Sequence, residues 1–229
     1  MSLQPRGLLL VWFDVPAEMD EEFNEWYDTE HVPEREAIPG VLSARRFLAP
    51  EDHPRYMAIY DLERPDVLQS APYLRITGPN ESPWTRRIRR KATRLVRNVY
   101  EQTSPAPGAG TWITGPHSPS GDLTGPAVLV EMADVPAELE AEFNDWYEHE
   151  HVIAELAIRG FRAARRFRVL EGQPLYLAMY ELDSVGVPST AACNLAPRPG
   201  RLSEPDRILP ALRSVRRMVY AQIYPQPKT

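Results

Sequence analysis

The stretch FNEWYDTEHV at residues 23–32 decides the fold, because it returns as FNDWYEHEHV at residues 143–152. Both copies have the apolar spacing of a helix, and both end in Glu-His. The sequence aligns with itself at an offset of 120 residues without a gap, which also matches Gly40 with Gly160 and residues 45–47 with residues 165–167. Two copies at so long a period indicate a duplicated domain rather than a solenoid.

The two copies are separated by a stretch with the composition of a linker. Residues 103–124 are rich in Pro, Gly and Ser, as flexible or extended connections are. The sequence therefore predicts a first module at residues 1–102, a linker at 103–124 and a second module at 125–229.

Within one copy, turn residues separate short apolar runs from helical patterns. Strands are expected at residues 8–15, 41–48, 56–62 and 95–102, with helices at about 17–31 and 84–90. The order β-α-β-β-α-β predicts an α+β fold, a four-stranded antiparallel sheet with both helices on one face. Two such sheets can pack their bare faces together into a barrel within one chain.

The first helix carries an apolar stripe that continues into two polar side chains. Phe23, Trp26 and Tyr27 share one helix face, and the next positions on that face are Glu30 and His31. Residues 143–151 repeat the stripe, and the opposite face is acidic. Burial of a carboxylate and an imidazole without partners costs a few kcal/mol or more, on the order of magnitude of other buried polar groups. These two groups must therefore be paired, or they must face a polar pocket between helix and sheet.

Two interpretations of the Glu-His pair remain open at this point. In one, Glu30 and His31 form a structural network with an arginine of the next strand. In the other, His31 is a general acid or base that Glu30 or Tyr27 orients in a small-molecule cavity. Arg45 and Arg46 are the available arginines, and strand alternation lets only one of them reach the helix side.

Composition and spacing argue against several other classes of protein. The net charge of −6 and the local character of the basic run at residues 86–91 argue against nucleic-acid binding. The apolar run at residues 7–13 is too short to cross a membrane. His149 and His151 are two residues apart on a helix, so they cannot hold one metal ion together. The single cysteine, Cys193, excludes an intrachain disulfide and fits a reducing compartment without proving one.

The motif WYDTEHVPER at residues 26–35 resembles the dimeric α/β-barrel superfamily, and within it the EthD-like proteins, whose first helix ends in a similar Trp…Glu-His-x-Pro pattern. The resemblance covers both copies. It implies an α+β fold in which two fused ferredoxin-like βαββαβ modules form an intrachain α/β barrel. Members include cofactor-free monooxygenases, lactone isomerases, polyketide cyclases, haem-degrading enzymes and stress proteins of unknown activity.

The site residues that the resemblance implies lie at the helix ends. The helix-end histidine of the family carries over to His31 and, through the repeat, to His151. The second copy has Ile153-Ala154-Glu155 in place of Pro33-Glu34-Arg35, so the first copy is the expected site. The predicted catalytic residues are His31, Glu30, Tyr27, His151 and Glu150, and the predicted substrate-binding residues are Trp26, Arg45, Arg46, Tyr147 and Trp146.

The expected function is a cofactor-independent enzyme that acts on a hydrophobic carbonyl, enol or aromatic-derived catabolite. His31 would move a proton, while Arg45 or Arg46 would steady an enolate or carboxylate. Isomerases, cyclases, lyases and monooxygenases all start in this way, and the sequence does not choose among them. The alternatives are a non-catalytic ligand-binding or stress-response protein, and a haem-binding protein. The expected partners are a small molecule and possible homodimers of the fused chain, with no cofactor, metal, nucleic acid or membrane, and the expected location is the cytoplasm.

Overall fold

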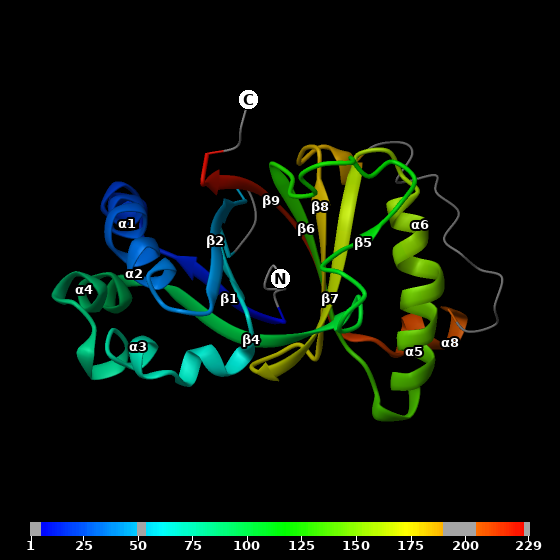
Figure 1. Ribbon diagram of the computed structural model, residues 1–229, viewed down its shortest axis with the longest axis horizontal. Helices are drawn as coiled ribbons and strands as arrows, with labels where there is room; N and C mark the ends of the chain where they lie inside the picture. The colour runs from blue at the N-terminus through cyan, green and yellow to red at the C-terminus, as the bar shows by residue number, and fades with distance from the viewer. Residues whose placement is uncertain (1–5, 50–53, 190–204, 227–229) are drawn as a thin grey trace. The chain divides into compact units, whose positions relative to one another are not determined.

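The computed structural model describes residues 6–49, 54–189 and 205–226 and has the α+β architecture that the sequence predicts. The chain divides into two compact units (Figure 1). The first contains the residues up to Glu101 together with those from Ile223 onward, and the second runs from Gln102 to Gln222. Cys193 lies outside the described residues. Among the described helices, none is long and apolar enough to cross a membrane.

The first unit is an antiparallel sheet with helices packed against it. Its strands are β1 (Gly7–Asp14), β2 (Val41–Leu48), β3 (Tyr56–Leu62) and β4 (Arg94–Ser104). They lie in the order β4-β1-β3-β2, so the first strand is central and pairs with both β3 and β4. These four strands agree with the predicted ones to within two residues at each end.

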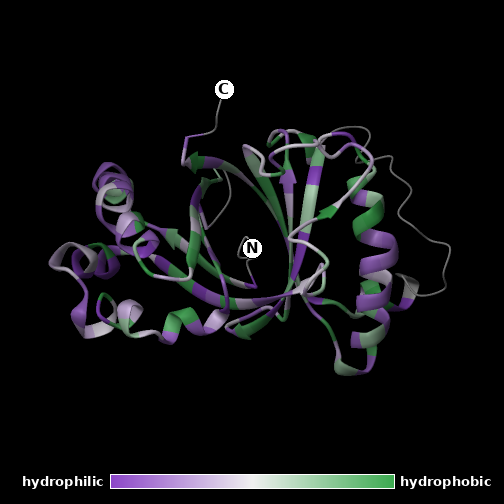
Figure 2. Ribbon diagram, in the orientation of Figure 1, coloured by the Kyte–Doolittle hydropathy of each residue, from purple (hydrophilic) through white to green (hydrophobic). Residues whose placement is uncertain are grey.

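The hydrophobic core of the first unit lies between the sheet and its helices. The residues of β1 that face the helices are Leu9, Val11 and Phe13, which alternate along the strand. They pack against Phe23 and the aromatic residues that follow it. Figure 2 shows hydrophobic and hydrophilic residues following each other along the helices, which is the amphipathic pattern that this packing requires.

The first helix is not a single α-helix. It consists of a 3₁₀ turn (Ala17–Met19), α1 (Asp20–Trp26), a π-helical turn (Tyr27–His31) and α2 (Val32–Glu36). The amide of Val32 donates to the carbonyl of Tyr27, five residues earlier, which is the bond that defines the π turn. The sequence predicted a regular helix here.

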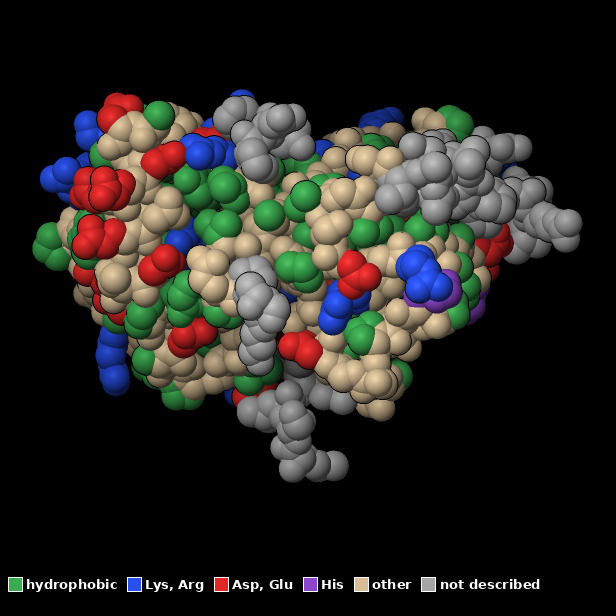
Figure 3. Space-filling view, turned by 90° about the horizontal axis from the view of Figure 1, so that it is seen from above, with side chains coloured by type: hydrophobic (Ala, Val, Ile, Leu, Met, Phe, Trp, Pro, Cys, Tyr) green, Lys and Arg blue, Asp and Glu red, His purple; other side chains and the backbone are tan. Residues whose placement is uncertain are grey.

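The outer face of this first helix is acidic, as expected, and Figure 3 shows the carboxylates gathered over this part of the first unit.

The segment before β4 also contains structure that the sequence did not predict. It comprises two 3₁₀ turns (Pro65–Gln69 and Gly78–Asn80), α3 (Ala71–Leu74) and α4 (Pro83–Lys91). Only α4 was expected, at residues 84–90. Ser82 caps α4, because its side-chain oxygen accepts a hydrogen bond from the amide of Thr85 at 2.9 Å.

The second unit repeats these elements. Its strands are β5 (Ile113–Thr114), β6 (Ala127–Asp134), β7 (Phe161–Glu171), β8 (Tyr176–Leu182) and β9 (Arg213–Tyr224), in the order β9-β6-β8-β7-β5. Its helices are α5 (Glu140–Trp146), a π turn (Tyr147–His151), α6 (Val152–Leu156) and α8 (Pro205–Ala211). The π turns of the two units lie at matching positions. A shift in strand register also recurs, between Val41 and Ser43 in the first unit and between Phe161 and Ala163 in the second.

The stretch predicted as a linker is partly built into the second unit. Strand β5 falls within residues 103–124 and pairs with β7, Ile113 opposite Ala164 and Thr114 opposite Ala163. The proline and glycine content of this stretch predicted a linker and did not reveal that two of its residues would pair with a sheet edge.

Gly40, which directly precedes β2, lies close to the side chain of Val67 in a left-handed backbone conformation. Its φ angle is +93°, and an added Cβ would lie 2.6 Å from Cγ2 of Val67. Gly78 is a matched control, since its φ is +60° but nothing lies within 4 Å of an added Cβ. We expect Gly40→Ala to lower the free energy of unfolding by about 1–2 kcal/mol for the left-handed backbone conformation and by about 1–3 kcal/mol more for overpacking against Val67. Gly78→Ala should lower it by the backbone contribution alone. Urea denaturation of both variants measures the difference, and equal losses would contradict the close approach to Val67.

Candidate functional site

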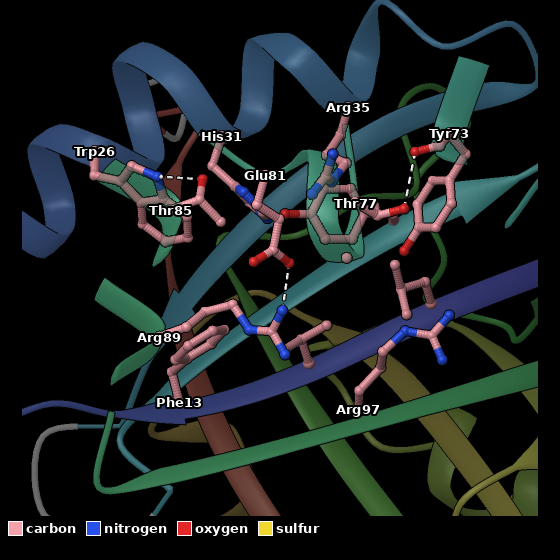
Figure 4. A pocket seen from close by; sticks show the side chains of 14 residues that line it. Phe13, Trp26, His31, Arg35, Tyr73, Thr77, Glu81, Thr85, Arg89 and Arg97 are labelled. Atoms are coloured by element: carbon pink, nitrogen blue, oxygen red, sulfur yellow. Dashed lines mark hydrogen bonds and ion pairs between the residues drawn. The ribbon is translucent and has the colours of Figure 1, made fainter. Parts of the chain in front are cut away.

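The first unit contains a cavity of about 270 Å³ between its helices and its sheet. Figure 4 shows Trp26, His31 and Arg35 projecting into it from the first helix, with Arg89 and Arg97 on the opposite side. The cavity is lined by Leu9, Val11, Phe13, Trp26, His31, Arg35, Tyr60, Tyr73, Thr77, Gly78, Glu81, Thr85, Arg89 and Arg97. Of the predicted site residues, this set includes His31 and Trp26.

The π turn places the imidazole of His31 directly over the indole of Trp26. The two residues are five positions apart, and their ring centroids are 4.4 Å apart. Tyr27 meets the imidazole edge-on at 5.0 Å between centroids. The Nδ1 atom of His31 is buried and has no hydrogen-bond partner among the described residues. Aromatic packing rather than a carboxylate therefore orients this imidazole.

The surroundings of His31 favour its neutral form. Burial lowers the pKa of His31 well below its ordinary value of 6.5, and the positive charges of Arg35, Arg46 and Arg89 lower it further. The imidazole is consequently unprotonated at neutral pH, which is the form that can accept a proton. Burial also raises the pKa of Tyr27 and that of Tyr60, so both phenols keep their protons.

Glu30 contacts the start of α4 rather than His31. Its carboxylate accepts a hydrogen bond from the hydroxyl of Ser82 at 2.5 Å and another from Thr85 at 3.3 Å. Thr85 in turn accepts from the indole nitrogen of Trp26 at 3.1 Å. Glu30 thus fixes α4 against the first helix and holds the indole on which His31 stacks.

Arg46 and Arg45 lie on opposite faces of β2, as strand alternation predicted, and neither lines the cavity. Arg46 reaches the helix, where it donates to Asp28 at 2.5 Å and to Asn24 at 2.6 Å, and its guanidinium lies 4.3 Å from the ring centroid of Tyr27. Arg45 lies over the ring of Phe47 at 5.3 Å. Arg46 is therefore held by its own partners, beneath the tyrosine that supports His31.

The cations that do line the cavity are ones that the sequence argument did not select. Arg35 comes from α2, Arg89 from α4 and Arg97 from β4. Arg89 forms an ion pair with Glu81. Arg89 belongs to the basic run at residues 86–91, and Arg35 belongs to the motif at residues 26–35. The difference between copies at positions 35 and 155 was the available signal.

The corresponding place in the second unit is occupied by a network of charged side chains. Glu131, where the first unit has Val11, accepts from Tyr147 at 2.6 Å and contacts Nε2 of His151 at 3.1 Å. Arg217, which matches Arg97, lies 2.9 Å from Glu131 and 3.4 Å from Glu155. The second unit thus has carboxylates at the two positions where the first unit has Val11 and Arg35.

Glu131, His151 and Glu155 have ligand atoms within 4.8 Å of one another, the spacing of a metal site. The guanidinium of Arg217 contacts both of these carboxylates. His149 points elsewhere: it is 72 % exposed and pairs with Asp145 at 3.0 Å. This agrees with the expectation that His149 and His151 do not face the same way.

The remaining predicted residues of the second unit take the positions of their counterparts. The imidazole of His151 lies 4.9 Å from the ring of Trp146 and 4.6 Å from that of Tyr147. One carboxylate oxygen of Glu150 is buried without a hydrogen-bond partner among the described residues, and the segment that matches Ser82 is not described. Roles for these four residues stay predictions.

Glu131 makes the stability of the second unit depend on pH. Burial by itself would raise its pKa, but the contacts with His151, Arg217 and Tyr147 lower it from 4.5 to about 2. The ionised form therefore contributes stability above pH 4.5, on the order of 3 kcal/mol, which is lost as pH falls from 4.5 towards 2.

We expect Glu131→Gln to remove this contribution. At pH 7 the variant should unfold at a lower urea concentration than the parent protein. The difference between the two urea midpoints should become smaller below pH 4.5. Asp183→Asn is the control, since Asp183 is 56 % exposed and its ion pair with Arg162 is a surface pair. A gap that is independent of pH would show that the charge of Glu131 is not what stabilises the unit.

Comparison with known proteins supports the fold and does not identify an activity. No family model and no curated protein matches the sequence. Among solved structures, an anthrone oxidase-like protein has a TM-score of 0.62 at 16 % identity, over 96 % of this chain and 92 % of that one. A mutant chlorite dismutase from Candidatus Nitrospira defluvii has a TM-score of 0.59 at 14 % identity, over 96 % of this chain and 92 % of that one.

A provisionally named monooxygenase from Fusobacterium nucleatum subsp. nucleatum has a TM-score of 0.58 at 9 % identity, over 96 % of this chain and 94 % of that one. These likenesses establish an α+β fold shared along nearly the whole length of each chain. Because fold does not determine chemistry, the activity has to be argued from the site.

Proposed function

We propose that this protein is a cofactor-independent enzyme that removes a proton from a carbon next to a carbonyl or enol group of a hydrophobic substrate. The observation that carries the proposal is His31, an unprotonated imidazole that lines a cavity with apolar and aromatic walls. A pocket of about 270 Å³ suits a small aromatic molecule. The solved structures named for monooxygenase and anthrone oxidase-like proteins are compatible with such chemistry.

The residues have distinct roles in this proposal. His31 accepts the proton, and Trp26 and Tyr27 hold its ring in place. Glu30 acts as a positioning residue through Thr85 and Trp26. The negative charge that develops on the substrate oxygen is stabilised by the arginines that line the cavity. Arg46 supports the ring of Tyr27 and does not contact the substrate.

The proposal assigns catalysis to the first unit. In the second unit, the network of Glu131, Glu155 and Arg217 occupies the corresponding place, and His151 already has a carboxylate partner. We further propose that the units are ferredoxin-like modules that arose by tandem duplication, supported by the shared π turn and strand register shift. Their packing into one barrel and the pairing of whole chains stay predictions.

Haem does not fit the cavity of the first unit as it stands. A porphyrin is larger than the ligands of a pocket of about 270 Å³, and the described wall offers one imidazole beside three arginines. We therefore derive no step through haem. A haem titration that gives a Soret band would contradict this conclusion.

Anthrone is a suitable test substrate, because it is a small aromatic ketone whose methylene group is acidic. We measure exchange of that methylene with deuterated water, and formation of anthraquinone and water from anthrone and O₂, each above the spontaneous rate. We expect His31→Asn to lower the catalysed exchange by about 100-fold or more, the usual contribution of a general base. His149→Asn is the control, because that imidazole is exposed.

The pH dependence gives a second test of the role of His31. Because the pKa of His31 lies well below 6.5, kcat/KM should stay level from pH 8 down to 6.5 and fall only in more acidic solution. If the protein is a ligand-binding protein without catalytic activity, neither the parent nor His31→Asn accelerates the exchange. If His31 is purely structural, the variant melts at a markedly lower temperature and shows the parental rate.

A further inference from the structure

Arg35 is a buried cation that forms no ion pair with a carboxylate among the described residues. Its residue exposure is 5 %, and its Nη1 atom is buried without a hydrogen-bond partner. The guanidinium lies over the ring of Tyr73, 5.4 Å from the centroid, and it lines the cavity. Burial of an unpaired charge is costly, so such a group indicates a site where the partner is supplied from outside.

The charge of the adjacent Glu34 interacts with Arg35 without forming an ion pair. The other carboxylates near Arg35 have partners of their own. Glu30 accepts from Ser82 and Thr85. Glu81, which also lines the cavity, is ion-paired with Arg89. Among the described side chains, no carboxylate forms an ion pair with Arg35. The pocket wall thus carries an excess of positive charge close to apolar residues.

The second unit shows what satisfies this arrangement when the chain supplies the anion itself. There, Arg217 matches Arg97, and its guanidinium contacts Glu131 and Glu155. The first unit has Val11 and Arg35 at the positions of those two carboxylates. The exchange of two carboxylates for an apolar residue and a cation makes this place more positively charged in the first unit than in the second.

We propose that the cavity of the first unit binds the carboxylate of a small aromatic carboxylic acid, with Arg35 as the residue that selects it. The inference rests on the proposed function for its reaction and adds the substrate class, a carbon acid that also carries a carboxylate. The guanidinium of Arg35 donates to the carboxylate, while the aromatic body lies against Phe13, Trp26 and Tyr60. The substrate then holds its acidic carbon near His31.

Binding of 2-naphthoate and of the neutral analogue 2-naphthamide tests this inference without any turnover. Quenching of tryptophan fluorescence reports binding, because Trp26 lines the cavity. We expect the parent protein to bind 2-naphthoate more tightly than 2-naphthamide. Arg35→Gln should lower the affinity for 2-naphthoate by about 10- to 100-fold, the range for a charged hydrogen bond. Its affinity for 2-naphthamide should stay within about twofold of that of the parent protein.

Two further variants keep the test decisive. Arg64→Gln is the matched control, since Arg64 is 66 % exposed and pairs with Asp66. Arg35→Lys retains the charge and should recover part of the preference for the carboxylate. The apo form of Arg35→Gln should melt no lower than the parent, because the substitution removes a buried unpaired charge.

The outcomes separate this inference from the proposed catalysis. Equal affinities for 2-naphthoate and 2-naphthamide, or an unchanged 2-naphthoate affinity in Arg35→Gln, would overturn the carboxylate site. If Arg35 stabilises only a developing enolate, Arg35→Gln lowers the exchange rate on anthrone without weakening 2-naphthoate, which also overturns it. If His31→Asn binds 2-naphthoate normally and no protein accelerates exchange, the carboxylate site stands and the catalytic proposal fails.

Discussion

The stacking of His31 on Trp26 is the contact on which the site depends. In a regular α-helix, residues five apart do not lie over one another, whereas a π turn brings them into register. The turn is stabilised by what surrounds it: the aromatic stripe packs on β1, Thr85 accepts from the indole, and Arg46 lies beneath Tyr27. A local departure from α-helical geometry thus determines which way an imidazole faces.

The same helix serves different purposes in the two units because a few cavity-facing positions differ. Val11 against Glu131 and Arg35 against Glu155 exchange apolar or positive side chains for negative ones. In the second unit the result is a network in which Arg217 contacts both carboxylates. In the first unit the result is a cavity lined by a neutral imidazole and by Arg35, which forms no ion pair among the described residues. The two units thus share the same elements and differ in the charges at these positions.

Much of the scaffold could be predicted because its signals are local. Alternation and apolar runs gave β1 to β4 within two residues at each end, and the repeat carried the assignment to the second unit. The site was harder. His31 and Trp26 lie on the cavity as the helical stripe suggested, but Glu30 turned out to contact Ser82 and Thr85, which are more than fifty residues away in the chain. Tyr73, Glu81 and Arg97 belong to segments whose relation to the helix no local pattern reveals.

The sequence by itself determined the internal repeat, the α+β class and the face of the helix that is buried, since periodicity and composition report on these directly. Tertiary structure alone decided that the helix contains a π turn, that Arg46 is held by Asp28 and Asn24, and that Arg35 reaches the cavity without a counter-charge. The physical reason is that these features depend on hydrogen bonds and charges between residues far apart in the chain. Only the folded arrangement shows which ionisable groups satisfy one another and which are left for a ligand.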